Sequence, residues 1–179
     1  MRDAGSMNLL PHALLGHTKA EGTVRIQRPT GEVFEFYRDF TNLPKFLGDV
    51  MSIDSTGEKT SRWTIHGPLG RKVQWDAEVI TEERNSLIRY QTTSFRGLKT
   101  TWNIHFSAAG DGVSDSTDVR EVMEVPLGGA GMKALALFGH PPNEEIAANL
   151  VRLKQLMETG RVTETRHAVP GKFDGAASS

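Results

Sequence analysis

The stretch NEEIAANLVRLKQLME, residues 143 to 158, is the longest part of the sequence with an unambiguous helical period. Its apolar residues recur every three or four positions and form one stripe, made of Ile146, Ala147, Leu150, Leu153, Leu156 and Met157. Pro141 and Pro142 are suited to open such a helix, and Gly160 is suited to stop it. A helix with one apolar stripe needs an apolar surface to lie on. Only the strand-rich middle of the chain is large enough to provide that surface.

The charges along this stretch agree with a helix in the same place. Glu144 and Glu145 lie at the positive end of the helix dipole, and Arg152 and Lys154 lie towards its negative end. We therefore expect a sheet folded around a C-terminal helix.

One strand and two short helices are predicted before the middle of the chain. Residues 23 to 28 alternate polar and apolar side chains, as a half-buried strand does. The segment from 31 to 47 places Val33, Phe36, Tyr37 and Phe40 on one face and then breaks at residues 42 to 44, NLP. This pattern predicts a helix, a tight bend and a shorter helix.

Strand patterns and turn signals alternate in the middle of the chain. Strands are predicted over residues 50–54, 62–67, 72–83, 87–93, 98–107 and 117–125. The connections between them are short, which favours antiparallel neighbours. Trp75 and Ala77 alternate with Gln74 and Asp76, and the other strands show the same alternation of apolar and polar side chains. One face of the sheet is therefore expected to be apolar and the other exposed to solvent.

Length and composition limit the class of protein. The 179 residues suffice for one ordinary domain, and the net charge of −1 leaves no electrostatic footprint for nucleic acid or an anionic membrane. The absence of cysteine excludes disulfides, thiol catalysis and cysteine-bound zinc. The apolar patch at residues 9 to 15 is too short for a membrane span. We expect a cytoplasmic protein, monomeric or homodimeric, with no nucleic-acid partner.

Four stretches carry a resemblance to a known family: FEFYRDFTNLPKFL at 34–47, RWTIHGPLG at 62–70, VQWDAEVI at 73–80 and RLKQLMETG at 152–160. Together with the order of elements, they resemble the START-like (SRPBCC) superfamily and, within it, the polyketide cyclase/dehydrase-like branch. The resemblance implies an α+β helix-grip fold, in which a curved antiparallel sheet wraps around a long C-terminal helix and two short helices follow the first strand. We divide the chain accordingly into an N-terminal extension (1–21), a START-like domain (22–160) and a C-terminal tail (161–179), which we expect to be an appendage.

The resemblance also implies a cavity between the concave face of the sheet and the long helix, suited to a hydrophobic or amphipathic small molecule. The residues expected to line it are Trp63, Trp75, Tyr90, Trp102, Phe106, Met123, Leu135, Phe138 and Leu150. Any one of the aromatic residues can instead fill the core, because large aromatic side chains dominate core burial.

Glu121 is the candidate acid/base. It shares strand parity with Met123 and Val125, so a cavity on that face would place a carboxyl in apolar surroundings. Desolvation there raises a carboxyl pKa and permits acid/base work. In the alternative, the strand twists, or Glu121 pairs with Arg89 or Arg120 at the rim.

Other motifs give no support to metal, phosphate or hydrolase chemistry. The six histidines show neither HxH nor HExxH spacing, so no metal site is expected, and His66 and His105 are expected to face solvent. The glycines of residues 126–131 lack the order of a phosphate-binding loop and indicate a flexible connector before a short helical stretch. A GxSxG nucleophile motif is absent as well. No cofactor is expected.

These observations lead to three hypotheses of function. In the first, the domain sequesters, senses or transports a hydrophobic molecule such as a lipid, a quinone or a polyketide, with Tyr90, Glu121 and Arg89 as candidate polar anchors. In the second, it is an enzyme of the cyclase or dehydratase type that uses Glu121. In the third, the sheet edge or the C-terminal tail binds another protein.

Overall fold

The computed structural model of the chain describes residues 18–93, 97, 99–110, 115–126 and 141–174. The strands are β1 (Thr18–Ile26), β2 (Val50–Ser55), β3 (Thr60–His66), β4 (Lys72–Glu83), β5 (Leu87–Thr93), β6 (Lys99–Ala108) and β7 (Thr117–Val125). The helices are α1 (Thr30–Arg38) and α3 (Pro142–Thr159), with two 3₁₀ turns, η1 (Phe40–Lys45) and η2 (Pro68–Gly70).

The described strands form one seven-stranded sheet in the order β1-β7-β6-β5-β4-β3-β2, and every neighbouring pair is antiparallel. The predicted helix-grip architecture is therefore confirmed. Strands β4, β5 and β7 have the bounds predicted from the alternation of their side chains, whereas β1 begins earlier, at Thr18. The predicted glycine-rich connector and the helical stretch after it lie almost entirely outside the described residues.

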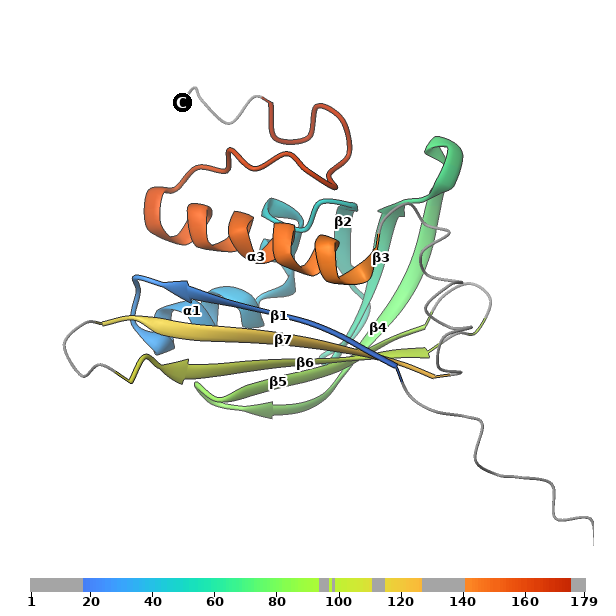
Figure 1. The fold of residues 1–179 in the computed structure, drawn as a ribbon. Coiled ribbons are helices and arrows are strands. Elements are labelled where there is room, and N and C mark those ends of the chain that lie inside the picture. Colours follow the sequence, from blue (N-terminus) through green and yellow to red (C-terminus); the bar gives the residue numbers. More distant parts are fainter. Residues whose placement is uncertain (1–17, 94–96, 98, 111–114, 127–140, 175–179) are drawn as a thin grey trace, which may run out of the picture.

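Helix α3 packs along β1, and the strands beyond β1 curve away beneath it (Figure 1). Gly22 permits the close contact, since a Cβ there would lie 2.9 Å from Ile146 Cγ2 and 3.0 Å from Leu150 Cδ1. At its other end the helix stops at Gly160, whose φ of 72° is the left-handed conformation that glycine adopts most easily. The concave face thus meets α3 at one side and diverges from it at the other.

Helix α1 and the η1 turn fill one end of the concave face with aromatic side chains. Phe106 from β6 makes edge-to-face contacts with Phe34 and Tyr37, at ring centroid distances of 5.3 and 5.8 Å. Phe46 lies 5.7 Å from Tyr37 by the same measure. All four side chains are buried, so this end of the sheet is a packed core.

The apolar stripe of α3 is only part of what the helix buries. Ile146, Leu150, Leu153 and Met157 are buried as predicted, but Ala147 is exposed. Ala148, Asn149 and Arg152 are buried as well. The additional buried side chains lie on a second face of the helix, which is covered by other parts of the chain.

The second face is covered in part by the segment after the helix. The sequence predicts an appendage from Arg161 onwards, whereas residues 161–174 return along α3 and bury Val162 and Phe173 (Figure 1). The backbone N–H of Val169 donates to the carbonyl of Gly48 at 3.0 Å. We call residues 161–174 the C-terminal strap, because they join α3 to the loop before β2.

Arg152 holds these segments together. Its side chain is fully buried, and its three nitrogens donate to the carbonyls of Phe46 and Arg166, each at 2.7 Å, and to Asn149 Oδ1 at 2.5 Å. The ring of Phe173 lies 5.3 Å from the guanidinium carbon. The sequence suggested that Arg152 complements the helix dipole, but its donors are used in joining α3, the η1 turn and the strap.

We expect Arg152→Met to destabilise the fold by about 3 kcal/mol, because the carbonyls of Phe46 and Arg166 lose the guanidinium donors and Asn149 Oδ1 keeps only the N–H of Gly48. The free energy of unfolding in urea measures this loss. Arg62→Met is the matched control, since Arg62 forms an exposed ion pair with Asp76 and its loss costs at most about 1 kcal/mol. Equal stabilities of the two variants would contradict the role assigned to Arg152.

Candidate functional site

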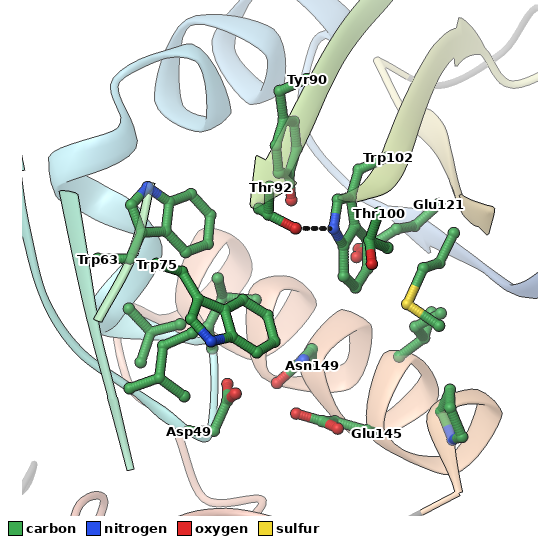
Figure 2. Close-up of a pocket in the computed structure, with 16 residues that line it drawn as sticks. Asp49, Trp63, Trp75, Tyr90, Thr92, Thr100, Trp102, Glu121, Glu145 and Asn149 are labelled. Carbon is green, nitrogen blue, oxygen red and sulfur yellow. Dashed lines mark hydrogen bonds between the residues drawn. The ribbon is translucent and has the colours of Figure 1, made fainter. Parts of the chain in front are cut away.

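A cavity of about 80 Å³ lies between the concave face of the sheet and the N-terminal half of α3 (Figure 2). It lies on the same concave face as the aromatic core beneath α1, at the other end of the sheet. Its lining residues come from the loop before β2, from strands β2 to β7 and from α3: Leu47, Asp49, Val50, Trp63, Ile65, Trp75, Tyr90, Thr92, Thr100, Trp102, Glu121, Met123, Pro142, Glu145, Ile146 and Asn149.

The structure brings six of the predicted site residues together. The six are Trp63, Trp75, Tyr90, Trp102, Glu121 and Met123. Their placement follows from register, because Tyr90 pairs with Trp102 and Trp102 pairs with Met123 across the sheet. The strand alternation read from the sequence is therefore sufficient to find this part of the wall.

Two predicted lining residues do not reach the cavity, and two lie outside the described residues. Phe106 belongs to the aromatic core beneath α1, because it stands two inward-facing positions along β6 from Trp102. Leu150 is buried where α3 packs on β1, beside Gly22. Leu135 and Phe138 fall within residues that the structure does not describe.

The aromatic side chains form one continuous wall. The rings of Tyr90 and Trp102 are stacked at 6.0 Å with an angle of 6° between their planes, and Trp63 lies 5.8 Å from Tyr90. The indole N–H of Trp102 donates to Thr92 Oγ1 at 3.3 Å, which fixes the orientation of that ring (Figure 2). The wall is thus largely apolar, with a few polar groups at defined positions, as is typical of small-molecule sites.

Glu121 lies in the wall with only 1% of its surface exposed. Its Oε2 atom has no hydrogen-bond partner among the described residues. Arg120 pairs with Glu21 on the outer face and Arg89 is exposed, so neither of the predicted rim partners reaches Glu121. Burial raises the pKa of Glu121 to about 8, so the carboxyl is protonated at neutral pH and can donate a hydrogen bond into the cavity.

Two tyrosines share the electrostatic surroundings of Glu121. Burial raises the pKa of Tyr37 and of Tyr90 well above the ordinary value, and the negative charge of an ionised Glu121 raises both further. All three groups therefore favour their neutral, proton-carrying forms. The Tyr90 ring lines the cavity, whereas Tyr37 lies behind it in the core.

A second acidic group at the opposite end of the cavity was missed by sequence reasoning. Asp49 follows η1, and Glu145 lies in the first turn of α3; Figure 2 shows their carboxyls near one another, next to Asn149. Burial raises the pKa of Glu145 well above its ordinary range, and the neighbouring Asp49 carboxyl raises it further. Burial also raises the pKa of Asp49. The two residues are far apart in the chain, and no local pattern links them.

An outer pocket of about 400 Å³ adjoins this end of the cavity. Four residues, Asp49, Ile65, Trp75 and Glu145, line both spaces. The remaining lining comes from His66 at the end of β3, from Gly67 and from residues 167–170 of the C-terminal strap. The carboxyl pair therefore stands where the cavity meets the outer pocket.

The described part of the chain shows neither a metal site nor a membrane-spanning helix. No group of three or more histidine, aspartate or glutamate side chains there has the geometry to hold a metal ion. None of the helices described is both long enough and apolar enough to cross a membrane.

Comparison with known proteins gives one family and several structural likenesses. The model of the family described as polyketide cyclase/dehydrase and lipid transport matches residues 17–158. A search of curated proteins finds no match.

Three solved structures illustrate the likeness of fold. DR_A0006 from Deinococcus radiodurans is 23% identical with a TM-score of 0.61, over 80% of this chain and 99% of that chain. A START superfamily protein from Mycobacterium smegmatis is 15% identical with a TM-score of 0.51, over 62% and 77%. The di-domain ARO/CYC protein BexL, from the BE-7585A biosynthetic pathway, is 19% identical with a TM-score of 0.56, over 79% of this chain and 50% of that chain. The fold is thus the START-like helix-grip fold.

The buried carboxyl of Glu121 predicts a pH-dependent stability. The folded state keeps this proton up to a pKa of about 8, whereas the unfolded chain loses it near 4.5, so folded protein binds more protons between these values. Stability therefore falls as pH rises through this window, by at most about 1.4 kcal/mol per pH unit from this group. Glu121→Gln is expected to flatten the fall.

Urea unfolding at a series of pH values measures this dependence. Glu78→Gln, at an exposed position on the outer face of β4, is the control and is expected to keep the wild-type slope. An unchanged slope in Glu121→Gln would show that Glu121 is solvated in the folded protein.

Proposed function

The chain belongs to the polyketide cyclase/dehydrase and lipid transport family, and we propose that it binds a hydrophobic or amphipathic small molecule, such as a lipid, a quinone or a polyketide, in its internal cavity. We place the binding unit within residues 22–160, flanked by an N-terminal extension and by the tail that includes the C-terminal strap. Sequestration, sensing and transport are all served by such a site.

The observation that carries this proposal is the carboxyl of Glu121 in an aromatic wall. A buried polar atom without a hydrogen-bond partner lowers the stability of the fold by about 1 to 3 kcal/mol, so stability alone does not explain its presence. The Oε2 atom of Glu121 is such an atom among the described residues. A ligand carbonyl or hydroxyl beside Glu121 would supply the missing partner, and the proton on the carboxyl would be donated to it.

Energetics indicate why a polar anchor is needed. Burying roughly 300 Å² of apolar ligand surface gives about 7 kcal/mol. Association costs at least about 4 kcal/mol in lost freedom, so apolar contact alone leaves roughly 3 kcal/mol, weaker than a millimolar complex. Hydrogen bonds from Glu121 and the Tyr90 hydroxyl add both affinity and orientation.

The size of the cavity bears on the kind of ligand. At about 80 Å³ it is smaller than the roughly 300 to 1,000 Å³ of typical ligand pockets. A polyketide- or lipid-sized molecule would therefore extend past Asp49 and Glu145 into the adjoining outer pocket of about 400 Å³. We expect one polar group of the ligand near Glu121 and the rest of its length, with any further polar group, towards the C-terminal strap.

Native mass spectrometry of the protein from its own host, followed by organic extraction, is expected to find a stoichiometric apolar adduct. Thr100→Phe is expected to abolish that adduct, because Thr100 is buried in the cavity wall and a phenyl ring there fills the space. Gln74→Phe, on the exposed face of β4, is the control and should retain it.

The same pair of variants separates ligand uptake from adventitious surface binding. An adduct that persists in a folded Thr100→Phe variant would contradict the cavity as its site. So would the absence of any adduct in the wild type, together with no thermal shift across a lipid, quinone and polyketide panel.

A second function, catalysis, is favoured by the pKa of Glu121. A carboxyl with a pKa of about 8 is an acid poised near neutral pH, which is the condition for efficient general acid catalysis. In an aldol-type cyclisation or a dehydration, Glu121 would donate its proton to the carbonyl or hydroxyl oxygen of a bound polyketide-like substrate. The structural neighbour BexL is described as an ARO/CYC protein, which agrees with this alternative.

If Glu121 is this acid, the rate with a poly-β-ketone substrate is expected to fall as pH rises through about 8, because the proton it donates is lost. Glu121→Gln is then expected to lower turnover at least about a hundredfold while substrate binding persists. Product formation followed by mass spectrometry measures both effects. Turnover at the wild-type rate in Glu121→Gln would remove this residue from the mechanism.

A further inference from the structure

The cavity has an unusual distribution of charge-bearing side chains. Asp49, Glu121 and Glu145 all line it, and none of its described lining residues is a lysine, an arginine or a histidine. Among the described lining residues, a fatty-acid carboxylate or a phosphate group would meet three carboxyls and no cation. The electrostatics of the lining thus disfavour anionic ligands.

The nearby cations are occupied behind the wall. Arg152 donates to Asn149 and to the carbonyls of Phe46 and Arg166, and the ammonium group of Lys172 contacts the carbonyls of Leu47 and Val50. Their charges favour the ionised form of Asp49, against the effect of its burial. Neither side chain lines the cavity, so neither is placed to bind a ligand anion.

An aromatic side chain completes the surroundings of the carboxyl pair. Figure 2 shows the Trp75 indole next to Asp49, with the nitrogen-bearing edge of the ring towards the carboxyl. An ammonium group is attracted both by ionised carboxyls and by the face of an indole ring. Asp49, Glu145 and Trp75 therefore surround a position suited to a cation.

The route from the outer pocket and the interior of the cavity both support a ligand at this position. Asp49, Trp75 and Glu145 also line the outer pocket, so a group seated there is reached from outside. Deeper in the cavity, the unpartnered Oε2 of Glu121 indicates that the interior is built to meet a polar or charged ligand group as well. The acidic pair is thus part of a defined cavity rather than an isolated surface cluster.

We propose that the preferred ligand carries a basic amine, whose ammonium group binds between Asp49 and Glu145 against Trp75 while its apolar part occupies the aromatic cavity. This inference rests on the proposed function and names the ligand class. Because burial and the Asp49 carboxyl raise the pKa of Glu145, an ammonium group bound between the two would favour the ionised form of Glu145.

Three probes with the same phenyl group and different head groups test the proposal: phenethylamine, phenethyl alcohol and hydrocinnamate. The chain has three tryptophans and all three line the cavity, so quenching of intrinsic fluorescence reports binding at this site. At neutral pH we expect the amine to bind at least about tenfold more tightly than the alcohol, since a charged hydrogen bond is stronger than a neutral one. Hydrocinnamate is expected to bind most weakly.

The double variant Asp49→Asn/Glu145→Gln locates the preference. It is expected to lower the ratio of amine affinity to alcohol affinity from at least about tenfold to about one. The double variant Asp54→Asn/Glu78→Gln, at two exposed positions, is the control for a general loss of negative charge. An amine preference that survives in the first variant, once its fold is verified by circular dichroism, would place the cation elsewhere and overturn the proposal.

The probes also separate this inference from the proposed function. Equal binding of amine and alcohol by the wild type would overturn the amine preference and leave the cavity as a ligand site. Binding of none of the three would count against the cavity as a ligand site and so against both proposals.

Discussion

The close packing of α3 on β1 at Gly22 decides where this molecule has room for a ligand. A side chain at position 22 would push the helix away, because Ile146 and Leu150 lie within about 3 Å of where its Cβ would be. With the helix held against one edge of a curved sheet, the other strands diverge from it. Aromatic residues of α1 and Phe46 after η1 fill the space on the concave face at one end. The cavity is the space that remains at the other end.

Buried polar groups are concentrated around that cavity and serve two distinct purposes. Arg152 has its donors used by carbonyls and an amide, so it joins α3 to the η1 turn and the C-terminal strap. Glu121 has no such partner for Oε2 among the described residues, and the carboxyls of Asp49 and Glu145 lie near one another, next to Asn149 (Figure 2). A satisfied polar group stabilises the fold, whereas the carboxyls of the cavity retain the capacity to bind.

The sequence predicts most of the fold because its signals are local. Strand alternation locates Trp63, Trp75 and Trp102 on the concave face, and the helical period of 143–158 locates the apolar stripe of α3. What it misses depends on contacts between distant segments. Asp49 and Glu145 meet only in the folded chain, and the burial of Arg152 depends on contacts with Phe46 and with the C-terminal strap. Phe106 alternates like Trp102, and its position under α1, rather than its pattern, places it in the core.

The most direct test of the ligand-binding account is the pKa of Glu121 itself, measured by ¹³C NMR of its side-chain carboxyl in the ligand-free protein. The account predicts titration at about 8, since the carboxyl is buried and its Oε2 has no partner among the described residues, and it predicts a change of that value once a ligand contacts the carboxyl. Titration near the ordinary glutamate value of about 4.3 would show a solvated or ion-paired carboxyl. That result would contradict an apolar cavity with Glu121 as its polar anchor.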